Sequence, residues 1–492
     1  MVPEQLVVRR PFDNTVYGVV PATPADAVPA AVARARQAQR SWERVPVRER
    51  ARVFRTLGRL VLSSRERILD TIQAETGKAR ISAFEELLDA ARAVDVFADE
   101  APRQLRPVRR RGAIPVLTVT HEHHRPVGVV GIVTPWNYPF TLPASDAAQA
   151  LLAGNAVVLK PDSQTPFTAL LLAELLAAAG LPEDLFQVLP GAGSVLGPAL
   201  VAEVDFLMFT GSTATGRQLA AACGERLIGF SAELGGKNPL IVLADANLRA
   251  AAAGTARAAF ANTGQVCVGI ERAYVLGAVY EQFVAELLAE VRALRLGAGF
   301  DWNIDVGSLA SARQLAAVTG HVEDAVARGA SVLAGGTPRP DLGPYCYEPT
   351  VLTGVTDEMA LCREETFGPV LALYRVESED EAVALANDSR YGLNASVWSA
   401  RRGEAVGARL RVGTVNVNEG YAAAWGSHSA PMGGMGDSGM GRRHGGHGLL
   451  KYTEPQTVAT QRLLQIAPPE GVRHESYAGV MTRAIALLNR VR

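Results

Sequence analysis

The stretch VGVVGIVTPWNYPFTLPASDAAQALLAGNAVVLK, residues 127–160, decides the fold class. It begins and ends with short apolar runs, VGVVGIV and NAVVLK, and a longer segment that fits a helix separates them. Continuous apolar runs bounded by turn residues indicate strands buried on both faces, and their alternation with helices indicates βαβ units. The stretch therefore predicts an α/β fold with a Rossmann-like parallel sheet.

The same alternation continues on both sides of this stretch. LFQVL, VDFLMF and RLIGFSA predict further buried strands, and TPFTALLLAELLAAAG predicts a helix between strands. A second alternating region begins near NPLIVLA and includes GASVLAGG, VLALYRV and GTVNVN, which predicts a second α/β domain. Upstream, apolar residues recur at intervals of three and four in ARVFRTLGRLVLSSRERILDTIQAE, which predicts helices. The pattern then changes to alternation in LTVTHEHHRPVGVV, which predicts an extended hairpin arm.

Composition limits the classes of partner. The chain has 492 residues, is 48% apolar and carries a formal net charge of -1, with dispersed basic residues. This pattern argues against nucleic acid as a partner and favours small molecules. The first residues lack the apolar core of a signal peptide, and no apolar run approaches the roughly 18 residues of a membrane span. Four cysteines without a CxxC pair fit a reducing compartment, so we expect a cytoplasmic protein that does not bind a membrane or a thiolate-held metal.

Four polar or glycine-rich elements follow predicted strands. Asn137 follows the first strand, Lys160 closes the second, FTGSTATG follows the fourth and Glu233 follows the fifth. Ligands of open parallel sheets bind beyond the carboxyl ends of the strands. The sequence therefore predicts one cleft that these elements share.

GSTATGRQLA, residues 211–220, is a glycine-serine turn that opens a helix. Such a turn directs backbone N–H groups and the positive helix end at a phosphate, which favours a dinucleotide, although a capped helix without ligand has the same pattern. A literal GxGxxG occurs at Gly434, Gly436 and Gly439. It lies in a glycine-rich loop near the chain end rather than in a βαβ unit, so we interpret it as a loop of the catalytic domain.

FANTGQVCVGIERAYV, residues 260–275, holds Cys267 just ahead of a predicted buried strand. A free cysteine is more often inert packing than a nucleophile, so the thiol alone leaves both interpretations open.

With PWNYP, FTGSTATG, ELGGKNP, GQVC and EETFGPV in this order, the chain resembles the aldehyde dehydrogenase superfamily from about residue 10 to about residue 465. KPDSQTP, VNEGYA and GLLKYTEPQTVA look most like its NADP-type succinate-semialdehyde dehydrogenase branch in actinobacteria. The resemblance implies an NAD(P)-binding domain, a catalytic domain and an oligomerisation arm that builds homodimers or homotetramers. The corresponding ranges are 1–107 with 127–236, 237–435, and 108–126 with 453–470, followed by a C-terminal amphipathic tail at 471–492.

The resemblance also assigns roles to residues. It implies that Cys267 is the nucleophile, Glu233 the general base and Asn137 the oxyanion donor in the oxidation of an aldehyde to its acid. The implied cofactor residues are Trp136, Lys160, Ser163, Gly211, Ser212, Gly216, Leu234, Glu365 and Phe367. Many NAD-using relatives carry glutamate where this chain has Ser163. Two unit charges about 4 Å apart interact by roughly 4 kcal/mol at a partly exposed site, so loss of that carboxylate favours NADP while NAD stays an alternative.

The implied substrate is succinate semialdehyde, oxidised to succinate. Typical relatives of that branch hold its carboxylate with two arginines, at the positions of Ala261 and Ser145 here. Gly269 replaces a second pocket cysteine, and Arg272, Tyr421, Trp425 and His428 are candidates for another pocket wall. A neutral aliphatic or aromatic aldehyde is therefore an alternative substrate. An acylating enzyme or a non-catalytic protein with this fold are further alternatives, and Glu233 argues against the first.

Two other stretches carry weaker signals. HEHH, residues 121–124, places His121 and His123 on one strand face, yet no further ligand of suitable spacing follows, so we expect no metal. In the tail, Tyr477, Val480, Met481 and Ile485 share one helical face. We expect that face to dock on the chain's own fold, with peripheral membrane contact as the alternative.

Overall fold

The computed structural model describes residues 4–114, 117–463 and 465–490. Contacts divide the chain into two compact units, Met1–Gln104 with Pro126–Thr453, and Leu105–Arg125 with Glu454–Arg492. Both large sheets lie in the first unit. Residues 1–3 of the expected cofactor domain, 115–116 and 464 of the expected arm and 491–492 of the tail lie outside the described residues.

The first sheet confirms the strands expected from residue 127 onwards. Its order is β19-β9-β8-β5-β6-β7, and all neighbours are parallel except β19 with β9. The strands are β5 (Val129–Val133), β6 (Ala156–Lys160), β7 (Phe186–Val188), β8 (Phe206–Thr210), β9 (Gly229–Glu233) and β19 (Gly439–Met440). Every residue of β5, β6 and β8 is buried, which explains their continuous apolar sequences.

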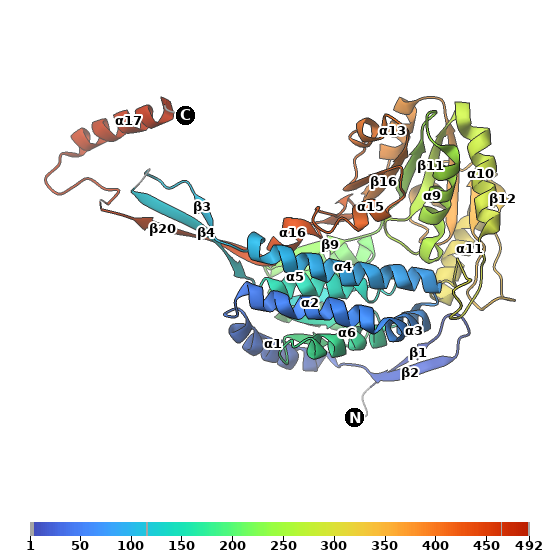
Figure 1. Cartoon of the computed structure of the whole chain (residues 1–492), viewed down its shortest axis with the longest axis horizontal. Coiled ribbons are helices and arrows are strands. Elements are labelled where there is room, and N and C mark those ends of the chain that lie inside the picture. Colours follow the sequence, from blue (N-terminus) through green and yellow to red (C-terminus); the bar gives the residue numbers. More distant parts are fainter. Residues whose placement is uncertain (1–3, 115–116, 464, 491–492) are drawn as a thin grey trace. The chain divides into compact units, whose positions relative to one another are not determined.

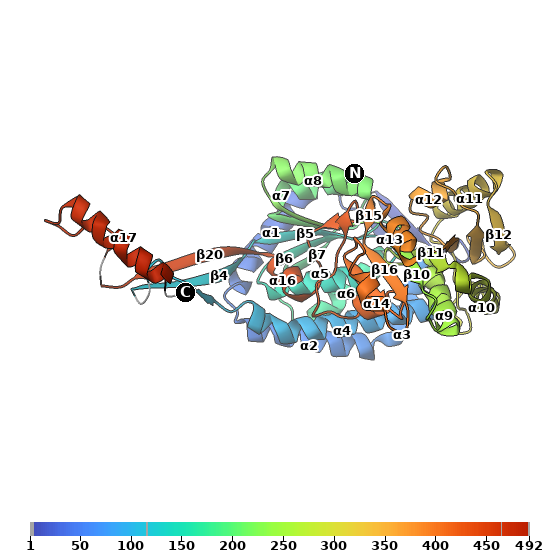
Figure 2. The same ribbon diagram turned by 90° about the horizontal axis from the view of Figure 1, so that it is seen from above.

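Helices cover both faces of this sheet, as Figure 2 shows. One face carries α1 (Val28–Trp42), α7 (Gly193–Glu203) and α8 (Thr213–Glu225). The other carries α5 (Thr141–Leu152) and α6 (Pro166–Ala178), against which α2 (Val47–Ser63) packs. Helix α4 (Arg80–Gln104) lies beside α2 and α5 (Figure 1).

Helix α3 (Arg65–Thr76) ends at Gly77, whose φ of 72° is left-handed. Glycine is the usual residue at this position after a helix because it lacks a Cβ. A Cβ at Gly77 would also lie 2.1 Å from the Ser308 hydroxyl. The turn leads directly into Lys78 and α4. The chain before α1 forms the hairpin of β1 (Gln5–Arg9) and β2 (Val16–Pro21) and the short helix η1 (Ala25–Ala27).

The second sheet confirms the second α/β region. Its order is β12-β13-β14-β11-β10-β16-β17, parallel except between β12 and β13. The strands are β10 (Asn238–Val242), β11 (Ile270–Leu276), β12 (Ser331–Ala334), β13 (Thr350–Thr353), β14 (Val370–Val376), β16 (Asn394–Trp398) and β17 (Thr414–Val417). Helices α9 (Leu248–Phe260) and α10 (Tyr280–Ala293) contact strands of this sheet, as do α13 (Glu379–Asn387) and α14 (Gly403–Gly407).

Shorter elements complete the first unit. They are η2 (Ala261–Gly264), η3 (Gly277–Val279), α11 (Ala312–Ala327), α12 (Ala360–Arg363), β15 (Tyr391–Gly392), α15 (Ala422–Trp425), β18 (Met435–Gly436) and α16 (Gly445–Leu450).

The second unit contains a three-stranded sheet and a terminal helix. The sheet order is β20-β4-β3, with β3 (Val108–Arg110), β4 (Thr118–Pro126) and β20 (Thr453–Gln461). Helix α17 (His474–Arg490) forms at the predicted place, but none of its described residues is buried. The docking of its apolar face on the chain's own fold stays a prediction. Across the described residues, no helix is both long and apolar enough to cross a membrane.

Candidate active site

The four sequence-predicted elements do meet at one edge of the first sheet. Because β5, β6, β8 and β9 are parallel, the residues that follow them share the carboxyl edge. The chain passes from β5 to β6 on one side and returns to β8 on the other, so the order reverses between β5 and β8. Asn137 follows β5 and Gly211 follows β8 at this reversal, and the Gly211 amide donates to the Glu233 carbonyl at 3.1 Å.

The segment before Cys267 has an unusual backbone. Asn262, Thr263 and Gly264 have φ values of 50°, 58° and 68°, all in the left-handed region. Such conformations cost energy in residues other than glycine and persist where surrounding contacts enforce them, often at functional sites. A Cβ at Gly264 would lie 2.0 Å from the Gly368 carbonyl oxygen, so only glycine fits there. The GQVC motif at residues 264–267 therefore packs closely against the FGP motif at residues 367–369.

Cys267 lines a cavity of about 280 Å³. Burial raises the pKa of its thiol to about 12, against the lowering effect of the Arg443 charge, and the Glu365 and Glu233 carboxylates raise it further. The thiol is therefore protonated at neutral pH. In this structure the loss of water around the sulfur opposes a thiolate more strongly than the Arg443 charge favours one.

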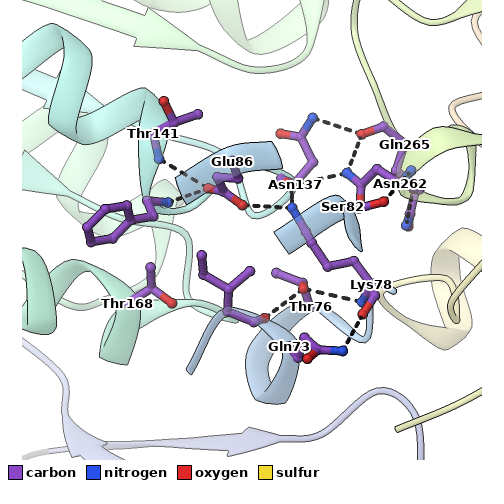
Figure 3. Close-up of polar contacts among 12 residues, drawn as sticks. Gln73, Thr76, Lys78, Ser82, Glu86, Asn137, Thr141, Thr168, Asn262 and Gln265 are labelled. Carbon is purple, nitrogen blue, oxygen red and sulfur yellow. Dashed lines mark hydrogen bonds and ion pairs between the residues drawn. The ribbon is translucent and has the colours of Figure 1, made fainter. Parts of the chain in front are cut away.

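Asn137 lies on the loop between β5 and α5 and is 3% exposed. Its side-chain Nδ2 donates to the Gln265 carbonyl at 3.0 Å, two residues before Cys267 (Figure 3). Gln265 is itself held, because its Oε1 accepts from the Ala310 amide at 2.9 Å. A primary amide has two N–H donors. One therefore fixes Asn137 to the cysteine segment, and the other remains for a ligand.

Glu233 is 3% exposed at the end of β9, and neither carboxylate oxygen has a hydrogen-bond partner among the described residues. Burial raises its pKa to about 7, opposed by the charges of Arg443 and Lys451. Strand β19 pairs with β9, with Gly439 opposite Glu233. The glycine-rich loop that carries the false GxGxxG thus joins the first sheet next to this carboxylate.

Arg443 is a fully buried cation whose charge acts on Glu233. Its guanidinium donates to both Asp146 oxygens, at 3.1 and 2.8 Å, and to the Thr210 hydroxyl at 2.8 Å. Sequence analysis missed this residue because it stands in a glycine-rich loop where an arginine is ordinarily solvated.

The turn that the sequence predicts as a phosphate site opens helix α8. Ser212 is the N-cap of α8, and its hydroxyl accepts from the Thr215 amide at 3.4 Å. A Cβ at Gly216 would lie 2.7 Å from a Leu234 methyl carbon, so glycine lets the first turn of α8 approach Leu234. Two residues assigned to the cofactor by resemblance are therefore in direct contact.

Lys160 and Ser163 lie against the loop that leads into α7. The Ser163 hydroxyl donates to the Gly191 carbonyl at 3.1 Å, and a Cβ at Gly193 would lie 3.5 Å from Lys160 Nζ. Lys160 is 4% exposed, and burial lowers its pKa. Its ammonium has no hydrogen bond or ion pair with any described residue, so this cation fits an anionic or hydroxyl-rich ligand.

The EETFGPV loop closes the other side of the cleft. Glu365 accepts a hydrogen bond from the Gly236 amide at 2.8 Å, and burial raises its pKa to about 8. Phe367 has a left-handed φ of 53°, and its ring packs edge-on against Trp136 with centroids 5.6 Å apart. The Thr366 and Phe367 amides donate to Glu271, which fixes this loop.

The cavity beside Cys267 has aromatic walls from Tyr138, Tyr421 and Trp425, with His428 also lining it. Three of the four residues proposed for a pocket wall thus lie there. Arg272 does not, because its guanidinium donates to backbone carbonyls, among them that of Lys237 at 2.7 Å. The residues that replace the two arginines do not line the cavity. Its charged lining residues are Glu85, Glu86, Asp89, Arg92 and Arg257.

Sequence analysis also missed Lys78 and Glu86, whose side chains are fully buried and paired at 2.8 Å. One signal was available. In α4, Glu86 falls on the stripe that buries Ala83, Leu87 and Ala90. A charge within an apolar stripe requires a partner, although periodicity cannot identify it.

Comparison with known proteins gives consistent matches. The family model described as "Aldehyde dehydrogenase family" matches residues 2–458. A Mycolicibacterium smegmatis protein named "Putative succinate-semialdehyde dehydrogenase [NADP(+)]" is 54% identical, covering 98% of this chain and 94% of its own length. A Methylomonas protein named 4,4'-diapolycopene aldehyde oxidase is 38% identical, covering 92% of this chain and 85% of its own. The crystal structure of succinate-semialdehyde dehydrogenase from Burkholderia pseudomallei has a TM-score of 0.89 and 34% identity, covering 93% of this chain and 95% of that one.

Proposed function

Because this chain belongs to the aldehyde dehydrogenase family, we propose that it oxidises an aldehyde to the carboxylic acid through a thioester on Cys267, with NAD(P) as oxidant. One observation carries the assignment of roles. The Asn137 amide is hydrogen bonded to the segment of Cys267, which lines a cavity large enough for a small aldehyde. The nucleophile and the oxyanion donor are thereby held in position relative to each other.

In the first step, the sulfur of Cys267 attacks the aldehyde carbon. The free N–H of Asn137 and the Cys267 backbone amide stabilise the oxygen that becomes negative. Removal of one such donor typically costs about 3 kcal/mol, or roughly a hundredfold in rate. Since the thiol begins protonated, the S–H bond breaks as the carbon–sulfur bond forms, and its proton passes to solvent water.

The cofactor residues fit a dinucleotide. The unpaired Lys160 ammonium can bind the adenosine ribose or its phosphate, the Gly211–Ser212 turn can bind the pyrophosphate, and Trp136 with Phe367 can hold the nicotinamide half. When bound, the oxidised cofactor supplies a hydride acceptor and a positive charge near the sulfur.

Glu233 is the base for the second step, in which water hydrolyses the thioester. Its carboxylate has no fixed partner among the described residues and a pKa of about 7, so it can take up a proton near neutral pH. This role distinguishes the proposal from an acylating enzyme, which needs no hydrolytic base.

NADP is the proposed preferred cofactor. Ser163 places a hydroxyl rather than a carboxylate near Lys160, so this position itself does not repel a 2′-phosphate. The M. smegmatis relative carries NADP(+) in its name. Titration of both cofactors should show higher kcat/KM with NADP, and Ser163→Glu should reverse the preference. A large NAD preference in the unaltered protein would contradict this proposal.

Succinate semialdehyde is the proposed substrate. The name of the M. smegmatis relative and one cationic side chain that lines the cavity support this proposal. Arg257 lines the cavity, and its guanidinium is 3.1 Å from Glu85. A substrate carboxylate can bind this arginine in place of Glu85. A neutral aldehyde is the second candidate, because the walls near Cys267 are aromatic and the Methylomonas relative is named for an apolar substrate.

A panel of succinate semialdehyde, hexanal and benzaldehyde separates the two substrates. Arg257→Met should raise KM about tenfold or more for succinate semialdehyde and leave hexanal unchanged, since loss of a charge-assisted hydrogen bond costs about 1.5 to 3 kcal/mol. Arg249→Met is the matched control, because Arg249 is an exposed arginine of the same helix that does not line the cavity. Faster turnover of the neutral aldehydes by the unaltered protein would favour the second candidate.

The remaining proposals concern organisation. We propose the division into cofactor domain, catalytic domain and arm, and assembly into homodimers or homotetramers through the arm sheet of β3, β4 and β20. Light scattering with and without residues 454–492 tests the assembly. A cytoplasmic location is supported by the free state of Cys223, Cys267, Cys346 and Cys362.

A further inference from the structure

The ion pair of Lys78 and Glu86 lies next to the candidate oxyanion donor. Both side chains are fully buried, and Lys78 Nζ is 2.8 Å from Glu86 Oε2. The same ammonium donates to the Asn137 carbonyl at 2.7 Å and lies 4.3 Å from the centre of the Tyr138 ring. Figure 3 shows Lys78 between Glu86 and Asn137. One buried cation thus contacts the catalytic loop at two consecutive residues.

The other oxygen of Glu86 binds the same loop further along. Glu86 Oε1 accepts from the Phe140 amide at 2.7 Å and from the Thr141 amide at 3.1 Å. These amides belong to the start of α5, where N–H groups have no partner inside the helix and a negative charge is favoured. The ion pair therefore holds this loop at two points, the Asn137 carbonyl and the first amides of α5.

A second donor reaches the Asn137 carbonyl from the cysteine segment. Asn262 Nδ2 is 3.2 Å from that carbonyl and 3.0 Å from the Gln265 carbonyl, which also accepts from Asn137. Asn262 is held in turn, because its amide donates to the Ser82 hydroxyl of α4 at 3.1 Å. Helix α4 and its preceding turn thus hold both the donor loop and the nucleophile segment.

Stability alone does not explain a pair of this kind. The cost of removing two charges from water commonly cancels their attraction, so buried pairs often add little net stability. A displacement of about 1 Å at a catalytic group, by contrast, can cost about a hundredfold in rate. We propose that Lys78 and Glu86 are positioning residues that hold the Asn137 side chain at the place where the oxyanion forms. This inference rests on the proposed role of Asn137.

The test is a mutant cycle on the full-length protein with NADP and succinate semialdehyde. Lys78→Met with Glu86→Gln removes both charges together and keeps an acceptor for the Phe140 and Thr141 amides. We expect the NADPH burst, which reports acylation, to slow tenfold to a hundredfold, with KM for the aldehyde changed less than threefold. Alkylation of Cys267 by iodoacetamide should keep its rate within twofold, because the sulfur itself is untouched.

The cycle is completed in an Asn137→Ala background. If the pair acts through Asn137, adding K78M/E86Q there should slow acylation less than threefold further. Equal losses in both backgrounds, or an unchanged burst in K78M/E86Q alone, would overturn the inference. An unchanged burst in Asn137→Ala alone would instead show that the proposed role of Asn137 is wrong.

The control is Arg36→Met with Asp205→Asn, a partly exposed ion pair that also holds a backbone amide. Asp205 pairs with Arg36 at 2.6 Å and also accepts from the Val129 amide at 2.8 Å, at the opposite end of the strand that leads to Asn137. Loss of this pair should leave the burst rate within threefold, and an equal slowing in the control would contradict a specific role. Should K78M/E86Q fail to fold, K78Q/E86Q retains a neutral hydrogen-bonding pair, and the same cycle applies to it.

Discussion

Two buried glutamates in this protein lie in opposite surroundings. Glu86 accepts hydrogen bonds from Lys78 and from two backbone amides. Glu233 is equally buried, yet neither of its oxygens has a partner among the described residues. A carboxylate whose two oxygens are both hydrogen bonded is held in place, whereas one without partners is free to meet a ligand or water. Burial alone therefore does not mark a catalytic acid or base, and the absence of fixed partners is the second feature that distinguishes Glu233.

The largest expected effect comes from Glu233→Gln. Steady-state turnover should fall by about 10² to 10⁴, the usual contribution of a general base, while a stoichiometric burst of NADPH remains. The melting temperature at pH 8 should not fall, because a buried charge without a partner has been removed. Turnover within threefold of the unaltered protein would show that Glu233 is not the base.

The stability of Glu86→Gln gives a second test of the difference between Glu86 and Glu233. This substitution leaves the Lys78 charge buried without its partner, which typically costs about 3 kcal/mol. Urea unfolding should therefore show a clear loss of free energy of unfolding in Glu86→Gln and none in Glu233→Gln. Equal stability of the two variants would break the distinction between a paired and an unpaired carboxylate.

The pH dependence of hydrolysis gives a third test. Burial raises the pKa of Glu233 from an ordinary 4.5 to about 7. The base must be unprotonated, so single-turnover release of the acid should rise about tenfold per pH unit below pH 7 and level off above it. The contribution of Glu233 to stability changes in the opposite direction. Because the folded state favours the protonated form, the free energy of unfolding falls as pH rises from 4.5 to 7. A rate independent of pH from 6 to 8 would contradict the prediction.

The smallest effect is expected at a third buried carboxyl, Glu75. It accepts from the Phe167 and Thr168 amides at the start of α6, as Glu86 does for α5, but no cation among the described residues pairs with it. Burial raises its pKa to about 8, so it is mostly protonated at pH 7. Glu75→Gln should therefore change stability by about 1 kcal/mol or less at pH 7. A loss as large as that of Glu86→Gln would show that the cation is not what distinguishes the two caps.

Much of the cleft could be predicted from the sequence, because short motifs report local structure. Continuous apolar runs become strands, and the residues directly after them, such as Asn137 and Glu233, must lie at one edge once the strands are parallel. Gly216 could be assigned from its motif. Why glycine is needed there, namely the close approach of α8 to Leu234, is seen only in the packed structure.

Other features followed only from the tertiary structure. Lys78 meets Asn137 across 59 positions of sequence, and Arg443 meets Asp146 across 297. The protonation of Cys267 also depends on how completely neighbours exclude water, which no local pattern encodes. The strands of both largely parallel sheets and the order of the motifs could be predicted from the amino acids alone, since hydrophobic periodicity is a local property. The packing of distant segments decided which charges are paired, which are left free and therefore which groups can exchange protons, because electrostatic energies depend on distances that only the folded chain defines.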